Sequence, residues 1–175
     1  MITMMFQNPP LILTLALESG AFNFFNTLRQ QHFPADRNFI DAHLTLFHAL
    51  PNEPAINHTV KNLASQVRTF TMTVVEPASI GNGVAYKIES RELMLLHKTL
   101  QDKWMNHLSR QDRQKLWPHI TVQNKVSFTE SQHLLQQLKN GFAPFSATAT
   151  GLQLWEYLNG PWKPVETFNF AQSPA

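Results

Sequence analysis

Two four-residue stretches of the 175-residue chain follow one pattern, in which a histidine and a threonine alternate with aliphatic residues. The first is HLTL at 43–46, and the second is HITV at 119–122, which begins 76 residues later. Because alternate residues of a β-strand point to the same face, each stretch would present its His and Thr together and bury its aliphatic pair. Two copies of one strand pattern constrain the chain to a fold with two related halves.

The elements around the two motifs repeat in the same order, a motif strand followed by a helix and a hairpin. Gly81 and Gly83 would permit the turn of the first hairpin, and Ser90 would cap the helix that follows it. The predicted elements are strand 11–18, helix 21–33, strand 43–50, helix 55–70, strands 70–77 and 83–90, helix 91–108, strand 119–126, helix 130–142 and strands 145–158 and 164–170. We expect one α+β domain over 1–175, with two approximate lobes at 1–89 and 90–175.

Composition limits the function classes that the chain can belong to. A net charge of +2 is too small to mark a general nucleic-acid binder. Between positions 98 and 125, however, six basic residues face two acidic ones, which indicates either an anion-attracting surface or an ordinary solvated helix face. The basic residues are Lys98, Lys103, Arg110, Arg113, Lys115 and Lys125, and the acidic ones are Asp102 and Asp112.

The chain contains no cysteine, which excludes disulfides, thiolate nucleophiles and cysteine metal sites. Its N-terminus lacks a basic segment before the apolar run at 11–17, and that run is too short to cross a bilayer. We therefore expect a cytoplasmic protein with no membrane association. The sequence also lacks nucleotide-binding glycine loops and a convincing metal-ligand spacing, so we expect no cofactor and no metal.

A His-x-Thr pair on a strand can handle a phosphate group. If the two motif strands face each other across a cleft, one imidazole can remove a proton from the attacking oxygen while the other protonates the leaving oxygen. The Thr45 and Thr121 hydroxyls would donate hydrogen bonds to the nonbridging oxygens. For one copy, an edge-strand polar pair is the better interpretation. Roughly 0.1 such quartets are expected by chance, so two favour chemistry.

These quartets, with the contexts LILTLALE, HLTLFHALP and WPHITVQNKV, resemble those of the two-histidine (2H) phosphoesterase superfamily and its 2′-5′ RNA ligase-like proteins. The resemblance implies a bilobal α+β fold with pseudo-twofold symmetry and a central cleft. It implies that His43 and His119 are the acid-base pair and that Thr45 and Thr121 bind phosphate. Some relatives have an arginine shortly after the second motif, where this chain has Lys125, a candidate substrate-binding residue.

Other residues near the two motifs have competing interpretations. Phe47 falls on the motif face under regular alternation, so it is a candidate substrate-binding residue that could stack on a base, although packing in the core is the favoured interpretation. His48 falls on the opposite face and is interpreted as structural. Trp117, two residues before the second motif histidine, could form part of the cleft wall but is better interpreted as a packing residue.

The leading hypothesis is a metal-independent phosphodiesterase that opens the 2′,3′-cyclic phosphates of RNA ends or nucleotides, mainly to 2′-phosphates. The alternatives are a non-catalytic module that binds RNA ends or phosphate, and a 2′-5′ RNA ligase-like activity. A protein-interaction domain with incidental His-Thr pairs ranks last. We expect a monomer whose partner is an RNA end or a small nucleotide, with no obligate protein partner.

Overall fold

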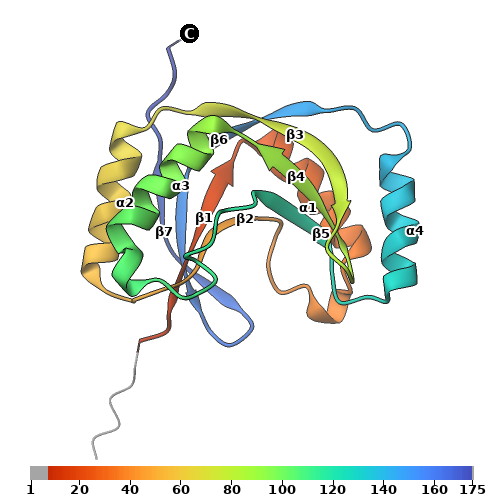
Figure 1. The fold of residues 1–175 in the computed structure, drawn as a ribbon, viewed down its shortest axis with the longest axis horizontal. Helices are drawn as coiled ribbons and strands as arrows, with labels where there is room; N and C mark the ends of the chain where they lie inside the picture. Colours follow the sequence, from red (N-terminus) through yellow and green to blue (C-terminus); the bar gives the residue numbers. More distant parts are fainter. Residues whose placement is uncertain (1–7, 175) are drawn as a thin grey trace, which may run out of the picture.

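The computed structural model describes residues 8–174, and residues 1–7, on which the prediction of a cytoplasmic location partly rests, lie outside this range. The order of strands and helices matches the order predicted from the sequence (Figure 1). The elements are β1 Leu11–Leu17, α1 Ser19–His32, η1 Ala35–Arg37, β2 Leu44–Leu50, α2 Pro54–Gln66, β3 Phe70–Ser79, β4 Val84–Glu89, α3 Arg91–Trp104, η2 Met105–His107, β5 His119–Gln123, α4 Phe128–Lys139, β6 Phe145–Tyr157 and β7 Trp162–Asn169.

One antiparallel sheet runs through the molecule in the order β2-β1-β6-β3-β4-β5, with β7 paired to β6. Reversing this order exchanges β1 with β4, β2 with β5 and β3 with β6, which is the pseudo-twofold symmetry expected of the fold. The repeated units are therefore β1-α1-β2-α2-β3 and β4-α3-β5-α4-β6. The predicted lobes 1–89 and 90–175 assign β4 to the first unit, whereas the symmetry of the sheet makes it the first strand of the second.

The last strand of each unit crosses to the other unit. β3 pairs with β4 and β6, while β6 pairs with β1 and β3. This exchange joins the two halves into one continuous sheet. The motif strands β2 and β5 are the two ends of the strand order, yet they lie near each other, because the sheet curls into a half-barrel.

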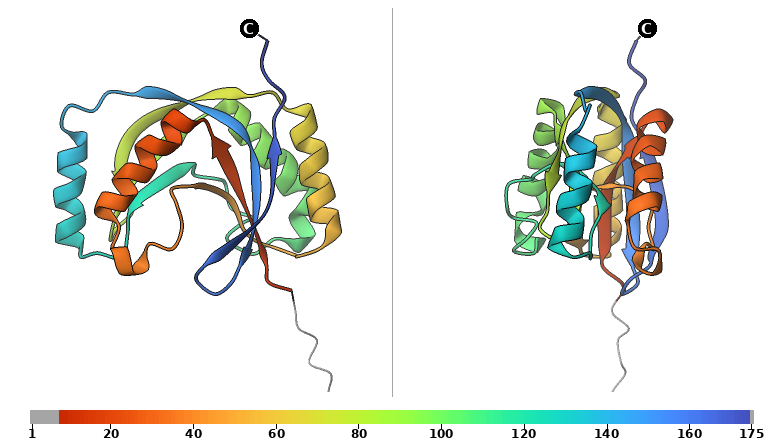
Figure 2. Two further views of the ribbon diagram at one scale, coloured as in Figure 1. Left: turned by 180° about the vertical axis from the view of Figure 1, so that it is seen from behind. Right: turned by 90° about the vertical axis from the view of Figure 1, so that its right-hand side faces the viewer.

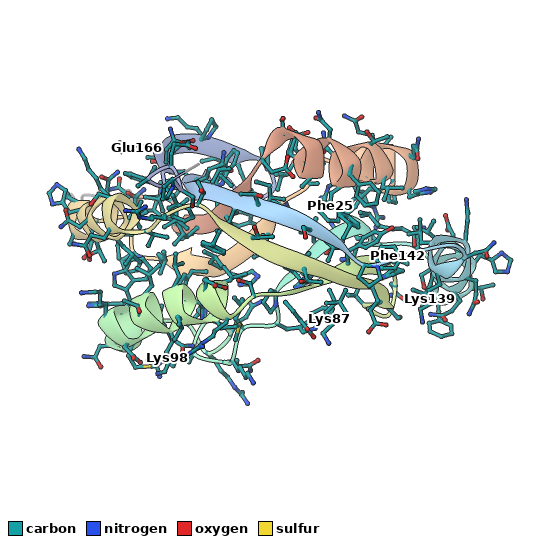
Figure 3. All side chains as sticks on the ribbon, turned by 90° about the horizontal axis from the view of Figure 1, so that it is seen from above. Phe25, Lys87, Lys98, Lys139, Phe142 and Glu166 are labelled. Atoms are coloured by element: carbon teal, nitrogen blue, oxygen red, sulfur yellow. The ribbon has the colours of Figure 1, made fainter. Side chains whose placement is uncertain are left out.

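The helices cover the sheet with the same symmetry. Figures 2 and 3 show α1 and α3 on opposite sides of the central strands, with α2 and α4 at the two ends. α1 packs on β5 of the other unit, where Arg29 Nη1 donates to the Thr121 carbonyl at 3.0 Å, and its Phe25 meets Tyr86 of the neighbouring strand β4 at 5.5 Å between ring centroids. α3 packs on β2, where His97 stacks on Phe47 at 4.6 Å. Each motif strand is therefore backed by a helix from the other unit.

Local sequence signals explain where the elements begin and end. The Ser90 side chain accepts a hydrogen bond from Leu93 N at 3.1 Å, as a helix N-cap should. α4 ends before Gly141, whose φ of 73° is one that glycine adopts without strain. Gly81, with φ 89°, makes the β3–β4 turn, whereas a Cβ on Gly83 would approach the Gln123 carbonyl to 2.0 Å. Gly83 therefore allows close backbone approach to the second motif strand.

Within residues 8–174, no helix has the length and apolar character needed to span a membrane.

Candidate active site

Four residues, which we call the motif site, lie on the sheet face away from the core: Thr45 in β2, His43 directly before β2, and His119 and Thr121 in β5. The aliphatic partners Leu44, Leu46, Ile120 and Val122 are almost completely buried. All four residues of the motif site remain partly exposed. Neither Thr hydroxyl has a hydrogen-bond partner within the described residues, so both can donate to a ligand. The predicted orientation of the two quartets agrees with this burial.

A β-bulge interrupts β2 at the end of its quartet. Thr45 pairs with Thr14 and Phe47 pairs with Leu13, so Leu46 is an extra residue with no partner. A bulge shifts the alternation of side chains by one position, and Leu46 and Phe47 are both buried as a result. The prediction that Phe47 faces the substrate is therefore wrong: its side chain is 0% exposed.

The same shift changes the place of His48. Regular alternation predicts that His48 lies opposite His43, but the bulge returns it to the face of His43 and Thr45, where its side chain is 44% exposed. Its Nδ1 and its backbone N both hydrogen bond to the carboxylate of Asp112. The prediction of an opposite face is wrong, because that prediction assumed an unbroken strand.

β5 carries an equivalent bulge. Thr121 pairs with Ala85 and Gln123 pairs with Val84, so Val122 is the extra residue. Gln123 consequently turns into the protein like Phe47, and its Oε1 is buried without a hydrogen-bond partner in the part of the chain that the structure describes. Both quartets therefore end in a bulge, so the two repeated units share this backbone feature as well as the His-Thr pattern.

Both motif histidines are held in the same way. His43 Nδ1 lies 2.8 Å from the carbonyl oxygen of Asp41, and His119 Nδ1 lies 2.7 Å from that of Trp117. A carbonyl oxygen only accepts, so each Nδ1–H donates and the neutral ring has its lone pair on Nε2. The backbone two residues upstream thus sets the same tautomer in both imidazoles.

An indole ring lies against each imidazole. Trp117 stacks on His119 with ring centroids 4.4 Å apart, and Trp162 of β7 lies 4.7 Å from His43. Trp117 is 42% exposed, so it lies beside the site rather than packing in the core as predicted. The sequence contains no local signal for Trp162, which comes from a hairpin 119 residues after His43.

Burial lowers the pKa of both motif histidines. Desolvation lowers the pKa of His43 to about 4; its bond to the Asp41 carbonyl opposes this shift, and the charges of Arg29, His119 and His48 add to it. Desolvation also lowers the pKa of His119, against its bond to Trp117, and the charge of His48 lowers it further. Both rings are therefore neutral at pH 7 without ligand, and the three histidines are close enough to influence one another.

Arg29 of α1 places a buried positive charge behind this group. Its Nη1 donates to the Thr121 carbonyl at 3.0 Å, and its Nε donates to Asn38 Oδ1 at 2.9 Å. Burial lowers the pKa of Arg29 to about 10, while Asp41 raises it, so the guanidinium stays charged. It connects the second motif strand to the loop that precedes the first one. Nothing in the sequence of its helix distinguishes Arg29 from a surface arginine, so the motifs alone do not predict its place at the site.

A pocket of about 580 Å³ opens beside His43. Its wall includes the aromatic residues Trp155, Trp162, Phe22 and Phe39 and the amides Gln30, Asn38 and Gln153. Neither His119 nor Thr121 lines it, so the pocket extends from the motif site on the His43 side.

Lys125 lies two residues beyond the end of β5, in a left-handed conformation with φ 61° and an exposed side chain. Within the described residues no hydrogen bond joins it to the motif histidines, and its substrate role stays a prediction. Of the basic residues between 98 and 125, Lys98 pairs with Asp102 on the outer side of α3 (Figure 3). In residues 8–174, no group of three or more His, Asp or Glu side chains is arranged to hold a metal ion.

The fold of this chain is similar to those of solved phosphoesterase structures. It is shared with E. coli LigT complexed with 3′-AMP, at 18% identity and TM-score 0.61, over 94% of this chain and 99% of LigT. It is shared also with TT0787 of Thermus thermophilus, at 15% identity and TM-score 0.65, over 94% of this chain and 100% of that one. Among curated proteins, none matches the chain significantly in sequence. The 2′-5′ RNA ligase superfamily model matches residues 17–161, and the chain belongs to this superfamily of 2H phosphoesterases.

Proposed function

We propose that the protein is a metal-independent phosphodiesterase that opens the 2′,3′-cyclic phosphates of RNA ends or nucleotides to 2′-phosphates. In this proposal His43 and His119 are the acid-base pair, and Thr45 and Thr121 bind the phosphate. The observation that carries the proposal is the matched state of the two imidazoles. Each is neutral at pH 7, each donates Nδ1–H to a backbone carbonyl, and each has an Nε2 without a hydrogen-bond partner among residues 8–174.

The proposed reaction needs one imidazole in each protonation state. The base accepts a proton at Nε2 from the attacking water, whose oxygen bonds to phosphorus. The P–O3′ bond breaks, and the acid gives its Nε2 proton to the leaving O3′, so the product has a 2′-phosphate and a 3′-hydroxyl. A bound phosphate anion raises the pKa of a nearby imidazole, which can supply the proton that the acid needs. The Thr hydroxyls stabilise the charge that develops on the nonbridging oxygens.

The pocket beside His43 supports a nucleotide as the substrate. Its volume is within the range of small-molecule sites, and its aromatic walls and amide groups suit the base and ribose of a nucleotide. The solved relative LigT was crystallised with 3′-AMP and, in another structure with 18% identity and TM-score 0.58, with NADP⁺. A nucleoside attached to the phosphate could extend into the pocket.

The proposal is tested with 2′,3′-cyclic AMP and the variants His43→Ala and His119→Ala. Each should lose about 10²–10⁴-fold in kcat, because each removes one proton-transfer group. Phosphorus NMR should identify a 2′-phosphomonoester as the product, and the rate should survive a metal chelator. His133→Ala, on the exposed face of α4, is the matched control and should retain full activity.

Three results would contradict the proposal: wild-type rates in both single variants, a strict metal requirement, or binding of the cyclic nucleotide without any phosphomonoester. The last result would favour the non-catalytic binding module. A 2′-5′-linked product from RNA fragments would favour the ligase activity instead.

A further inference from the structure

A third histidine is built into the site beside the motif pair. Asp112, in the connection between α3 and β5, is 3% exposed, and its carboxylate accepts three groups from β2. His48 N lies 2.9 Å from both carboxylate oxygens, Ala49 N lies 3.0 Å from Oδ2, and His48 Nδ1 lies 3.0 Å from Oδ1. The side chain and the backbone at position 48 are therefore held by one buried anion.

The position of Asp112 is itself fixed by neighbouring groups. Its backbone N donates to Ser109 Oγ at 3.2 Å, and its carbonyl accepts from Gln101 Nε2 at 3.0 Å. Burial raises the pKa of the Asp112 carboxyl, but the hydrogen bonds and charge from His48 and Ala49 outweigh this effect and the net pKa is lowered. The carboxylate is thus negative at neutral pH, and it stays in place beneath β2.

A second irregularity of β2 meets the carboxylate. The pairing with β1 shifts again between Leu11 and Leu13, so His48 and Ala49 together oppose one residue of β1. In a regular strand, successive backbone N–H groups point to opposite sides, whereas here those of His48 and Ala49 reach the same carboxylate. β2 is an end strand of the sheet, so these groups would otherwise lack a partner strand. Asp112 stabilises this second irregularity, while the bulge at Leu46 returns His48 to the face of the motif site.

The ring of His48 has one nitrogen left for a ligand. Asp112 is an acceptor, so Nδ1–H donates to it, and Nε2 has no hydrogen-bond partner among residues 8–174. The side chain is 44% exposed, so Nε2 can meet a ligand from solvent. A charge on His48 lowers the pKa of both His43 and His119, which agrees with a location near both rings.

We propose that His48 is a third phosphate-binding side chain of the motif site, whose Nε2–H donates to a phosphate oxygen while Asp112 accepts from Nδ1–H and sets the direction of the ring. The ring lies between two acceptors, the Asp112 carboxylate and the phosphate, and it donates to both when each ring nitrogen carries a proton. The inference rests on the proposed function only for the position of the phosphate between His43 and His119.

The test uses two variants, each of which keeps a hydrogen-bond donor at the place of only one of the two ring nitrogens. In His48→Asn, the amide can still donate to Asp112, but nothing occupies the place of Nε2. In His48→Gln, the longer amide reaches toward the place of Nε2 and can donate to phosphate. Inorganic phosphate is the probe, and its Kd is measured by titration of the ring nitrogen resonances. His48→Asn should weaken binding about tenfold, as expected for the loss of a charged donor, and His48→Gln should recover part of the affinity.

Further readouts make the result decisive. In the wild type, phosphate should shift the His48 Nε2 resonance; in His48→Asn, KM for 2′,3′-cyclic AMP should rise more than kcat falls. His133→Gln is the matched control and should behave as wild type. Wild-type phosphate affinity in His48→Asn, an unmoved Nε2 resonance, or no phosphate binding by the wild type would each overturn the inference. Because phosphate binding is measured without turnover, weakened binding in His48→Asn alongside an inactive wild type would overturn the proposed function alone.

Discussion

At the scale of single residues, the protein controls protons through small local contacts. The Asp41 and Trp117 carbonyls choose the tautomer of the motif histidines, and desolvation keeps the rings neutral. Neutral rings suit the general base, while the acid has to gain a proton when the substrate anion binds. The balance between these two states should therefore be visible in the pH dependence of catalysis.

The pH optimum of kcat/KM should lie below pH 6.5. Catalysis needs one of His43 and His119 protonated and the other neutral, and burial lowers the pKa of both below the ordinary value, that of His43 to about 4. The singly protonated free enzyme is therefore most abundant between these two lowered values. Initial rates with 2′,3′-cyclic AMP between about pH 4 and pH 8 check this. An optimum at or above pH 7.5 would contradict the lowered pKa values.

At the scale of elements, the two bulges decide which side chains reach the motif site. In β2 the bulge buries Phe47 and returns His48 to the motif face, and in β5 it buries Gln123 at the corresponding position. After the β2 bulge, the residue that points into the protein is Phe47, whose ring stacks on His97. After the β5 bulge, the corresponding residue is Gln123, whose amide oxygen has no hydrogen-bond partner among the described residues.

Replacing Gln123 with Met should raise the free energy of unfolding by about 1 kcal/mol, because an unpaired buried acceptor is removed at similar volume. Gln101 is the matched control, since it is also buried but its Nε2 donates to the carbonyls of Asp112 and Gln114. Gln101→Met should lower the free energy of unfolding by roughly 1–3 kcal/mol. Urea denaturation measures both. A loss of stability in Gln123→Met as large as that in Gln101→Met would show that the Gln123 oxygen is satisfied in solution.

At the scale of the whole molecule, histidines with lowered pKa values couple folding to pH. Desolvation lowers the pKa of His32 on α1, His43 beside β2, His97 on α3 and His119 on β5, so they belong to both repeated units. Protonating them costs more in the folded protein than in the unfolded chain. The effect belongs to the fold as a whole, because the sheet and its crossed helices desolvate all four rings.

The free energy of unfolding should be highest above about pH 6.5, the unfolded pKa of histidine. It should fall as the pH drops from there toward the lowered pKa values, to about 4 for His43, because only the unfolded state takes up protons in this range. Asp112 adds a second loss below its ordinary pKa, since its lowered pKa stabilises the fold only while it is ionised. Urea unfolding at several pH values checks this, and His97→Gln should reduce the slope. Equal stability at pH 7 and pH 4.5 would contradict it.

The sequence by itself determined the order of the elements, the duplicated motif strands and the face that each His-Thr pair presents. Hydrophobic period, caps and turn glycines are local properties, and a local pattern is readable without the fold. Only the tertiary structure decided the exchange of β3 and β6, the bulges after Thr45 and Thr121, and therefore the places of Phe47 and His48. A bulge depends on the register with a partner strand, so strand alternation alone cannot reveal it. Arg29, Asp112 and Trp162 reach the site from distant segments for the same reason, because the curl of the sheet and the crossing of helices bring them there.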